Sequence, residues 1–165
     1  MNRLMYAEAG GVTPELVRER KFLQPGQLIA TAKPTAVTTI LGSCVAVCLF
    51  DRSRRIGGVN HFLLAMHAGG SVASPRFGNV AIDMLLEQMR ALGARLPLLE
   101  AQIFGGACMF QQMASPDHLG LRNVEVARTL LSARGIDVVR SDVGGSRGRK
   151  LIFNTDEGMA CLNLI

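Results

Sequence analysis

The chain has 165 residues, of which 48% are hydrophobic and 19% are charged. This length suffices for one domain with a buried core, and the composition is that of a globular protein, which excludes a disordered chain. The formal net charge is +5, but the arginines are scattered and the chain offers one tyrosine and no tryptophan for base stacking. Nucleic-acid binding is therefore disfavoured, and a basic surface that attracts an acidic protein partner explains the charge equally well.

The N-terminal residues include Glu8 and lack the apolar segment of a secretion signal. The longest apolar run, residues 36–50, is broken by polar residues and is shorter than the ~20 residues of a membrane-spanning helix. We therefore expect a cytoplasmic protein, in which the four cysteines are thiols. No two of them form a C-x-x-C pair, so a structural zinc site has little support.

Strands and a few helices are expected along the chain. A first segment, residues 1–25, is a less certain N-terminal extension in which Thr13-Pro14-Glu15 suits a helix start. Aliphatic and β-branched runs predict strands, and amphipathic periodicity with end signals predicts helices. The expected strands cover residues 27–32, 37–41, 44–50, 56–64, 98–104, 136–143, 150–154 and 159–165. The expected helices cover residues 79–92, ended by Gly93, and 123–133, capped by Asn123. Residues 1–165 are thus predicted to form a single α/β domain of mostly antiparallel strands with two or three covering helices.

Cys44 is the first candidate for chemistry, because it follows a Gly42-Ser43 turn. A thiol at such a turn can be partly exposed and close to free backbone N–H groups, which could stabilise the oxyanion formed when the thiol attacks a carbonyl. The alternative is that Cys44 is a small buried hydrophobic residue, the commonest fate of an isolated cysteine. Cys48 lies on the same strand face but deeper in the apolar run, and we interpret it as core.

His61 supports the catalytic interpretation through strand register. If the strands that contain Cys44 and His61 pair across an even-length loop centred on Ser53-Arg54, Ala46 lies opposite His61. Cys44 and His61 are then diagonal neighbours on one face, ~7–8 Å apart at the backbone, which a thiol and an imidazole can bridge. A loop of odd length would place them on opposite faces. Taken alone, His61 is better explained as a satisfied core histidine.

A nucleophile and its base usually need a third group that orients the base. Thr38 and Thr39 could each supply a hydroxyl or a carbonyl, and their positions in the sequence do not choose between them. Both could also be ordinary strand threonines. The other two histidines, His67 and His118, lie in loops rich in small residues and are expected to be solvated.

An ordered set of segments runs through most of the chain. It comprises Thr38-Thr-Ile-Leu-Gly-Ser-Cys-Val-Ala-Val-Cys-Leu-Phe-Asp51, Gly57-Gly58, Asn60-His61, Phe104-Gly-Gly-Ala107, Met109-Phe110, Gly120-Leu-Arg-Asn123, Asp142-Val-Gly-Gly145, Gly148-Arg149 and Thr155. A glycine-serine-cysteine tripeptide alone would be weak, but the ordered set is highly specific. It resembles the CheD family of chemoreceptor glutamine deamidases over residues 28–160.

The resemblance implies that Cys44 is the nucleophile, that His61 is the base, and that Thr38, not Thr39, orients the base. It also implies an α/β layered sandwich similar to the catalytic domain of cytotoxic necrotizing factor toxins. The implied substrates are methyl-accepting chemotaxis receptors, and some family members bind the phosphatase CheC as a receptor-like competitor. One departure is Ala65, where the family often has proline, and this change is expected to loosen the loop of residues 66–78.

The expected reaction is hydrolysis of a glutamine side chain through a thioester on Cys44, without a metal or organic cofactor. His61 is expected to bring the apparent pKa of the thiol below the ~8.5 of a free cysteine. The same acyl-enzyme could form from a glutamyl methyl ester. The residues expected to bind the substrate or a partner helix are Ser43, Gly105, Gly106, Phe110, Gly144 and Gly145; the two glycine pairs do not form a phosphate-binding pattern.

Two alternatives stay open. One is a non-enzymatic chemotaxis adaptor that binds receptors or a CheC-like phosphatase, and the other is a thiol hydrolase that acts on small amides.

Overall fold

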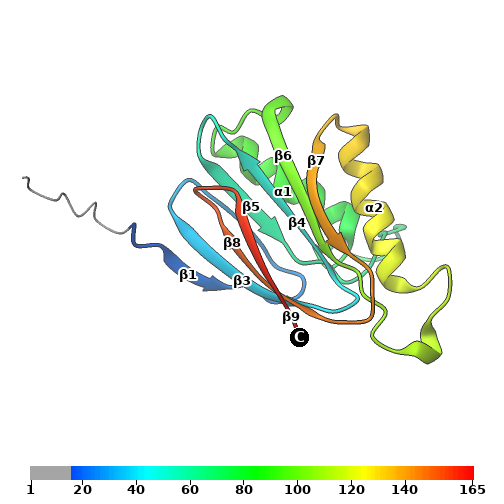
Figure 1. The fold of residues 1–165 in the computed structure, drawn as a ribbon. Helices are drawn as coiled ribbons and strands as arrows, with labels where there is room; N and C mark the ends of the chain where they lie inside the picture. The colour runs from blue at the N-terminus through cyan, green and yellow to red at the C-terminus, as the bar shows by residue number, and fades with distance from the viewer. Residues whose placement is uncertain (1–15) are drawn as a thin grey trace, which may run out of the picture.

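The computed structural model describes residues 16–165. Its strands are β1 (Glu19–Phe22), β2 (Leu28–Thr31), β3 (Thr35–Leu41), β4 (Val45–Asp51), β5 (Ile56–Asn60), β6 (Leu99–Gly105), β7 (Asp137–Val143), β8 (Arg149–Asn154) and β9 (Met159–Leu164). Two α-helices, α1 (Gly78–Ala91) and α2 (Leu119–Ala133), accompany two short 3₁₀-helices at Leu96–Leu98 and Gln111–Met113. The elements form a sandwich of three layers (Figure 1).

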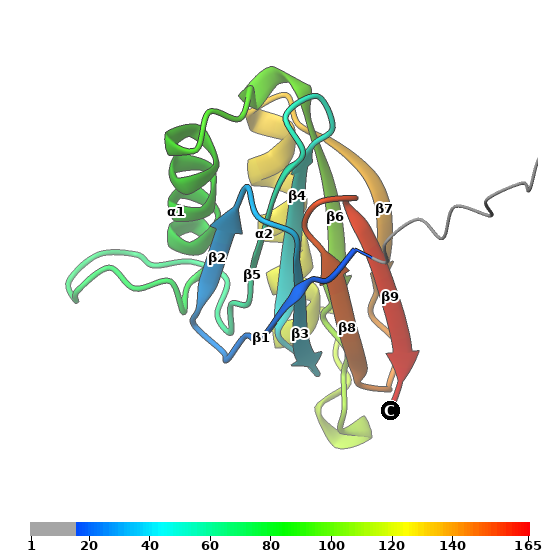
Figure 2. The same cartoon turned by 90° about the vertical axis from the view of Figure 1, so that its left-hand side faces the viewer.

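Two sheets form two of the layers. Sheet A has the order β1-β3-β8-β9, and sheet B has the order β2-β5-β4-β6-β7. Both helices cover the side of sheet B that faces away from sheet A (Figure 2). Among the strand pairs of residues 16–165, only β1–β3 and β6–β7 are parallel. The predicted α/β sandwich of mostly antiparallel strands with covering helices is therefore confirmed. No helix within residues 16–165 has the length and apolar character needed to cross a membrane.

Sheet B has a hydrophobic core on each face. Val45, Val47 and Leu49 of β4 pack with the helices, and Ala46 and Cys48 pack with sheet A. Because both faces of β4 are covered, all seven of its residues are buried, which explains why the sequence shows a continuous apolar run there and not an alternating one.

The turn between β4 and β5 sets the register of the two strands. Asp51 pairs with Ile56, so the loop has four residues, as the even-length prediction requires. The Asp51 carboxylate accepts hydrogen bonds from the backbone N–H groups of Ser53, Arg54 and Arg95 at 2.9, 3.1 and 2.7 Å. Burial alone would raise the pKa of Asp51, but these hydrogen bonds outweigh it and lower the pKa, which keeps the turn charged and fixed.

Three elements differ clearly from the sequence-based expectation. The strand expected over residues 56–64 ends at Asn60 as β5. β1 was not expected, because its four residues are all exposed and lack an apolar face. α2 begins at Leu119, four residues before the predicted start, and its N-cap is His118, whose Nδ1 accepts a hydrogen bond from the Leu121 N–H at 3.2 Å. The prediction that Asn123 caps this helix is wrong, since Asn123 is fully buried in its second turn. The helix start expected at Thr13-Pro14-Glu15 lies outside the described residues.

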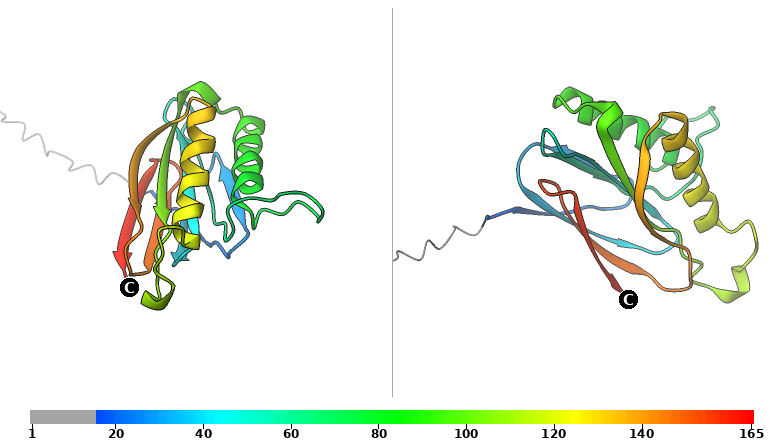
Figure 3. Two further views of the ribbon diagram at one scale, coloured as in Figure 1. Left: turned by 90° about the vertical axis from the view of Figure 1, so that its right-hand side faces the viewer. Right: turned by 45° about the horizontal axis from the view of Figure 1, so that its top comes forward.

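Two loops project from the layers (Figure 3). The loop of residues 106–118 extends beyond the end of the sandwich, below the start of α2. The loop of residues 61–77 extends outward from the start of α1, and its ends are joined because the N–H groups of Leu63 and Leu64 both donate to the Arg76 carbonyl at 2.9 and 3.0 Å.

Candidate active site

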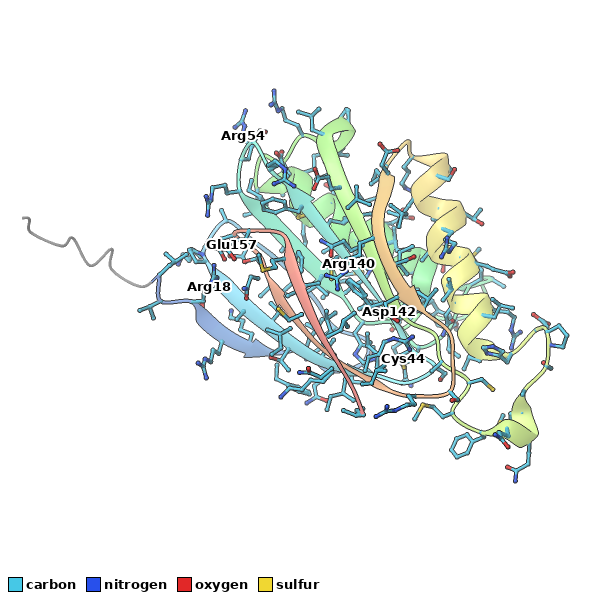
Figure 4. The ribbon with its side chains drawn as sticks, viewed as in Figure 1. Arg18, Cys44, Arg54, Arg140, Asp142 and Glu157 are labelled. Carbon is cyan, nitrogen blue, oxygen red and sulfur yellow. The ribbon has the colours of Figure 1, made fainter. Side chains whose placement is uncertain are left out.

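Cys44 lies in the short link between β3 and β4, at the end of the molecule opposite the turn that carries Arg54 (Figure 4). Its side chain is half-buried and packs against the core between the two sheets. Hydrogen bonds from the segment after β6 hold the link that contains Cys44. The Gly42 carbonyl accepts from the Ala107 N–H at 2.9 Å, and the Cys44 carbonyl accepts from the Gly106 N–H at 2.8 Å. The Gly42-Ser43 turn therefore places the thiol at the edge of the core, as its position in the sequence predicted.

His61 reaches the same face of sheet B. The register of β4 and β5 continues past the end of β5 to a bridge between Val45 and Phe62, whose N–H and carbonyl groups exchange hydrogen bonds of 3.1 and 3.0 Å. Ala46 therefore lies opposite His61, and the register predicted from the sequence is confirmed. Since Cys44 and Ala46 both pack toward sheet A, Cys44 and His61 are diagonal neighbours on that face.

Thr39 fixes the imidazole of His61. The Thr39 hydroxyl donates to the Leu23 carbonyl at 2.8 Å and lies 2.7 Å from His61 Nδ1. A hydroxyl has one hydrogen, and Leu23 receives it, so Thr39 must accept a hydrogen bond from a protonated Nδ1. The proton then resides on Nδ1, and the lone pair of Nε2 is free. His61 is 1% exposed and its Nε2 has no hydrogen-bond partner among residues 16–165, so this nitrogen is free to accept a proton.

The structure corrects the residue expected to orient His61. Inward-facing residues alternate along β3, so Val37, Thr39 and Leu41 are buried while Thr38 faces the other way. Thr38 is half-buried and pairs with Ile152 of β8, and its carbonyl accepts from the Leu23 N–H at 2.8 Å. The residue that accepts the hydrogen bond of His61 Nδ1 is therefore Thr39, the alternative that the sequence left open, and not Thr38.

Burial keeps both members of the pair neutral. It lowers the pKa of His61 from 6.5 to about 4. It also raises the pKa of the Cys44 thiol, and the backbone N–H of Cys44 only partly offsets this effect. The resting site therefore contains a thiol and a neutral imidazole, and the expectation that His61 lowers the apparent pKa of the thiol stays a prediction. If the Cys44 sulfur attacks a carbonyl, its thiol proton must therefore pass to His61 Nε2 during the attack.

Asn60 is a site residue that the sequence reasoning did not interpret. Its Oδ1 accepts from the Val47 N–H at 2.9 Å, in place of a carbonyl in the ladder between β4 and β5. The backbone of His61 pairs instead with the segment before β2. Its N–H donates to the Gln27 carbonyl at 3.0 Å, and its carbonyl accepts from the Gly26 N–H at 2.7 Å. The sequence contained a signal for this role: Asn60 stands at the end of an apolar strand, and an asparagine that is buried there needs a polar partner.

Gly105 and Gly106 are buried, so they do not form the partner surface expected of them. A Cβ on Gly105 would lie 2.2 Å from the Cys44 carbonyl oxygen, and a Cβ on Gly106 would lie 2.5 Å from Cγ2 of Val124. Both glycines also have positive φ, 106° and 69°. They allow α2 to approach the short link of residues 42–44 that carries the candidate nucleophile Cys44, here called the nucleophile link. This role corrects the prediction.

Ser43 and Phe110 line a cavity of about 420 Å³ beside the nucleophile. The cavity lies between the Ser43 turn, the loop of residues 107–118 and the start of α2; its apolar lining comes from Ala107, Met109, Phe110, Met113 and Leu119, and its polar lining includes Ser43, Asp117, His118 and Arg122. Met109, Phe110 and Met113 are 46, 63 and 69% exposed. An apolar surface next to a nucleophile suits the approach of a protein segment.

Gly144 and Gly145 support the base of that loop. The Gly144 N–H donates to the Gly105 carbonyl at 2.9 Å, and the Gly145 carbonyl accepts from the Cys108 N–H at 2.8 Å. A Cβ on either glycine would meet nothing within 4 Å, but their φ values of 77° and 71° favour glycine. Neither lines the cavity, so their predicted contact with a partner stays a prediction. His67 and His118, expected to be solvated, are half-buried and hydrogen-bonded within their own segments.

Comparison with known proteins identifies the family. A family model described as CheD chemotactic sensory transduction matches residues 63–163. A relative from Anaeromyxobacter dehalogenans, named probable chemoreceptor glutamine deamidase CheD 1, is 47% identical over 155 residues, which cover 93% of this chain and 90% of the relative. The chain belongs to the CheD family.

Further CheD relatives carry the same name. A probable chemoreceptor glutamine deamidase CheD from Trichlorobacter lovleyi is 45% identical over 86% of this chain and 88% of its own length. One from Sulfurimonas denitrificans is 39% identical over 89% of this chain and 95% of its own length. The alignments to these three relatives cover 86–93% of this chain, which is more than the residues 63–163 that the family model matches. They also cover 88–95% of the relatives' own lengths. Similarity to cytotoxic necrotizing factor toxins stays a prediction.

Proposed function

We propose that this CheD-family chain converts glutamine side chains of methyl-accepting chemotaxis receptors to glutamate by hydrolysis through a thioester on Cys44. The observation that carries the proposal is the state of the His61 imidazole. Thr39 holds its Nδ1, its Nε2 has no hydrogen-bond partner among residues 16–165, and the ring lies on the face of sheet B that also bears Cys44. The names of the CheD relatives support a chemoreceptor as the substrate.

Acylation follows from the neutral pair. The Cys44 sulfur attacks the glutamine Cδ carbonyl while His61 Nε2 takes the thiol proton, and the carbonyl electron pair moves onto oxygen. The oxyanion lies near the backbone N–H of Cys44, which donates to no other residue among residues 16–165. When the oxyanion collapses, the C–N bond breaks and Nε2 returns the proton to nitrogen, so ammonia leaves and a thioester remains.

Deacylation reuses the same base. A water molecule loses a proton to His61 Nε2 as its oxygen attacks the thioester carbonyl. Collapse of the second tetrahedral intermediate breaks the C–S bond and yields glutamate, and Nε2 returns the proton to the Cys44 sulfur. A glutamyl methyl ester would enter the same route, with methanol leaving in place of ammonia.

The surroundings of Cys44 suit a protein substrate better than a small amide. The exposed side chains of Met109, Phe110 and Met113 form an apolar rim beside Ser43. A receptor helix can bury such a rim, whereas free glutamine cannot. The net charge of +5 favours approach to an acidic receptor surface in the cytoplasm, an attraction that salt weakens.

The same rim is our proposed contact for a CheC-like phosphatase, together with Gly144 and Gly145. Such a partner would exclude the receptor, so adding it should raise the apparent KM for a receptor fragment and leave kcat unchanged.

Substitution of Cys44 tests the proposal. The wild-type protein, incubated with a receptor cytoplasmic fragment, should produce the amide-to-acid mass change on glutamine and release ammonia. Cys44→Ala should abolish both, because no other residue is given the nucleophile's role. Cys161→Ala is the matched control, since Cys161 is an exposed thiol outside the site, and it should keep wild-type turnover.

Three other outcomes would point elsewhere. Turnover by a folded Cys44→Ala protein would contradict the thioester. Receptor binding without any mass change in the wild type would favour the adaptor. Ammonia release from free glutamine at the rate seen with the receptor fragment would favour a small-amide hydrolase.

A further inference from the structure

Asn123 is a fully buried polar residue that joins α2 to the nucleophile link. Its Nδ2 donates to the Ser43 carbonyl at 3.0 Å and to the Leu63 carbonyl at 2.9 Å. Two carbonyl acceptors require the amide nitrogen at this position, so the orientation of the side chain is determined. Ser43 directly precedes the nucleophile, and Leu63 lies two residues after His61.

The contact with Ser43 determines where the backbone N–H of Cys44 points. All peptide bonds among the described residues are trans, and in a trans peptide the carbonyl and the following N–H point in opposite directions. Because Asn123 holds the Ser43 carbonyl toward α2, the Cys44 N–H points away from α2. It donates to no other residue of the described chain, and it lies close enough to its own sulfur to lower the pKa of the thiol.

The adjoining peptide is fixed as well. The Cys44 carbonyl accepts from the Gly106 N–H at 2.8 Å. Rotation of the Ser43–Cys44 peptide is therefore opposed by Asn123 on one side and by Gly106 on the other. An N–H donor that is fixed in advance stabilises a developing oxyanion more than one that must reorient during the reaction.

We propose that Asn123 is a positioning residue that holds the Ser43–Cys44 peptide so that the Cys44 N–H faces the oxyanion of the tetrahedral intermediate. The inference rests on the proposed function and extends it to the residue that maintains the oxyanion site. Asn123 itself does not touch the substrate. It acts through the peptide that precedes the nucleophile.

Two substitutions of Asn123 test the role. Asn123→Ala removes the amide, and Asn123→Asp keeps its size but, when ionised, has no hydrogen to donate to either carbonyl. Each should lower kcat for the receptor fragment by about 10- to 100-fold and leave KM nearly unchanged, because the oxyanion exists only after binding. Leu131→Ala is the matched control, since Leu131 is equally buried on α2 but lies away from the site, and it should lower stability without lowering kcat.

Alkylation of Cys44 by iodoacetamide, followed by mass spectrometry, separates this role from general damage to the site. Alkylation forms no oxyanion, so its limiting rate at high pH, where the Cys44 thiol is fully ionised, should be the same in both Asn123 variants as in the wild type. Wild-type kcat in either folded variant would overturn the inference. So would a parallel loss of kcat and alkylation, which would mean that Asn123 supports the thiol and not the oxyanion. Absence of deamidation by the wild type would instead reject the proposed function.

Discussion

At the scale of single residues, the proposed catalytic base, His61, depends on one hydroxyl. The hydrogen bond from Thr39 to the Leu23 carbonyl determines which nitrogen of His61 carries the proton. Without it, the imidazole could present a protonated Nε2 to the thiol and would be unable to accept its proton. Burial already keeps His61 neutral, so the tautomer decides whether the pair can react.

Replacement of Thr39 tests this dependence. Thr39→Val keeps the shape of the side chain but leaves the Leu23 carbonyl and His61 Nδ1 without their partner. We expect kcat for the receptor fragment to fall by about 10- to 100-fold, part of what a positioned base contributes. The free energy of unfolding should fall by about 1–3 kcal/mol, because two buried polar groups lose their hydrogen bonds. Steady-state kinetics and urea denaturation measure the two effects.

Thr38→Val is the matched control. No hydrogen bond of the described residues uses the Thr38 side chain, so its loss should change kcat little. Equal losses in the two variants would mean that strand packing, and not the hydroxyl of Thr39, accounts for the effect.

At the scale of elements, two glycines let α2 approach the nucleophile link. A Cβ on Gly120 would lie 2.3 Å from the Gly106 carbonyl oxygen, and a Cβ on Gly106 would lie 2.8 Å from the Gly120 carbonyl oxygen. The backbones of the loop and of the first turn of the helix are therefore in direct contact. This contact brings Asn123, one turn further along, within reach of Ser43.

Gly120→Ala should force the helix and the loop apart. The added methyl group meets backbone, which cannot rotate away, so we expect a loss of about 1–3 kcal/mol in the free energy of unfolding. Asn123 should move away from Ser43, and kcat should fall with it. Glu125→Ala, at an exposed position of the same helix, should change neither quantity. Wild-type stability and kcat in Gly120→Ala would show that the contact has room to relax.

The elements also show what the sequence could and could not predict. Strands with apolar runs, and α1 with its regular apolar face, were predicted because burial determines their pattern. The start of α2 was not, since Gly120 has a low helix propensity and the backbone contact that favours it lies far along the chain. The choice between Thr38 and Thr39 failed for a related reason. Alternation shows that the two face opposite sides, but only the packing of the sheets shows which side holds His61.

At the scale of the whole molecule, the two sheets are joined by polar contacts as well as by their shared core. The Arg149 guanidinium of β8 donates to the Asp142 carboxylate of β7 at 2.8 and 2.9 Å. Arg140 of β7 donates to the Ala160 carbonyl of β9 at 2.6 Å and lies over the Phe104 ring, 5.5 Å from its centre. Figure 4 shows Asp142 and Arg140 on the strand that lines the open edge of sheet B. The proposed base and nucleophile, His61 and Cys44, lie where these sheets meet, so the site should lose its geometry when the sandwich unfolds.

Acid should destabilise the molecule through His61. The pKa of His61 is about 4 in the native state and ~6.5 in an unfolded chain, so between these values the unfolded chain binds a proton that the native state does not. The free energy of unfolding should therefore fall as the pH drops from ~6.5 to ~4, by up to about 3 kcal/mol. Urea denaturation at a series of pH values measures this loss.

The control is His61→Gln, which should lose less stability over the same range. The lowered pKa values of Asp51 and Asp156 account for little of the effect, because their contribution is lost mainly below the ordinary aspartate value of 3.8. An equal loss in wild type and His61→Gln would assign the acid sensitivity to other groups.

The hydrogen bond that ends at Leu23 has a consequence for how this site can change in evolution. The acceptor is a main-chain carbonyl, which every amino acid possesses, so substitutions at position 23 that keep an apolar side chain in the core preserve the anchor of the base. Residue identity at this position is then free to drift among descendants while the path of the backbone is inherited. An insertion or deletion between β1 and β2 would be the damaging change, because it would shift a different carbonyl toward Thr39.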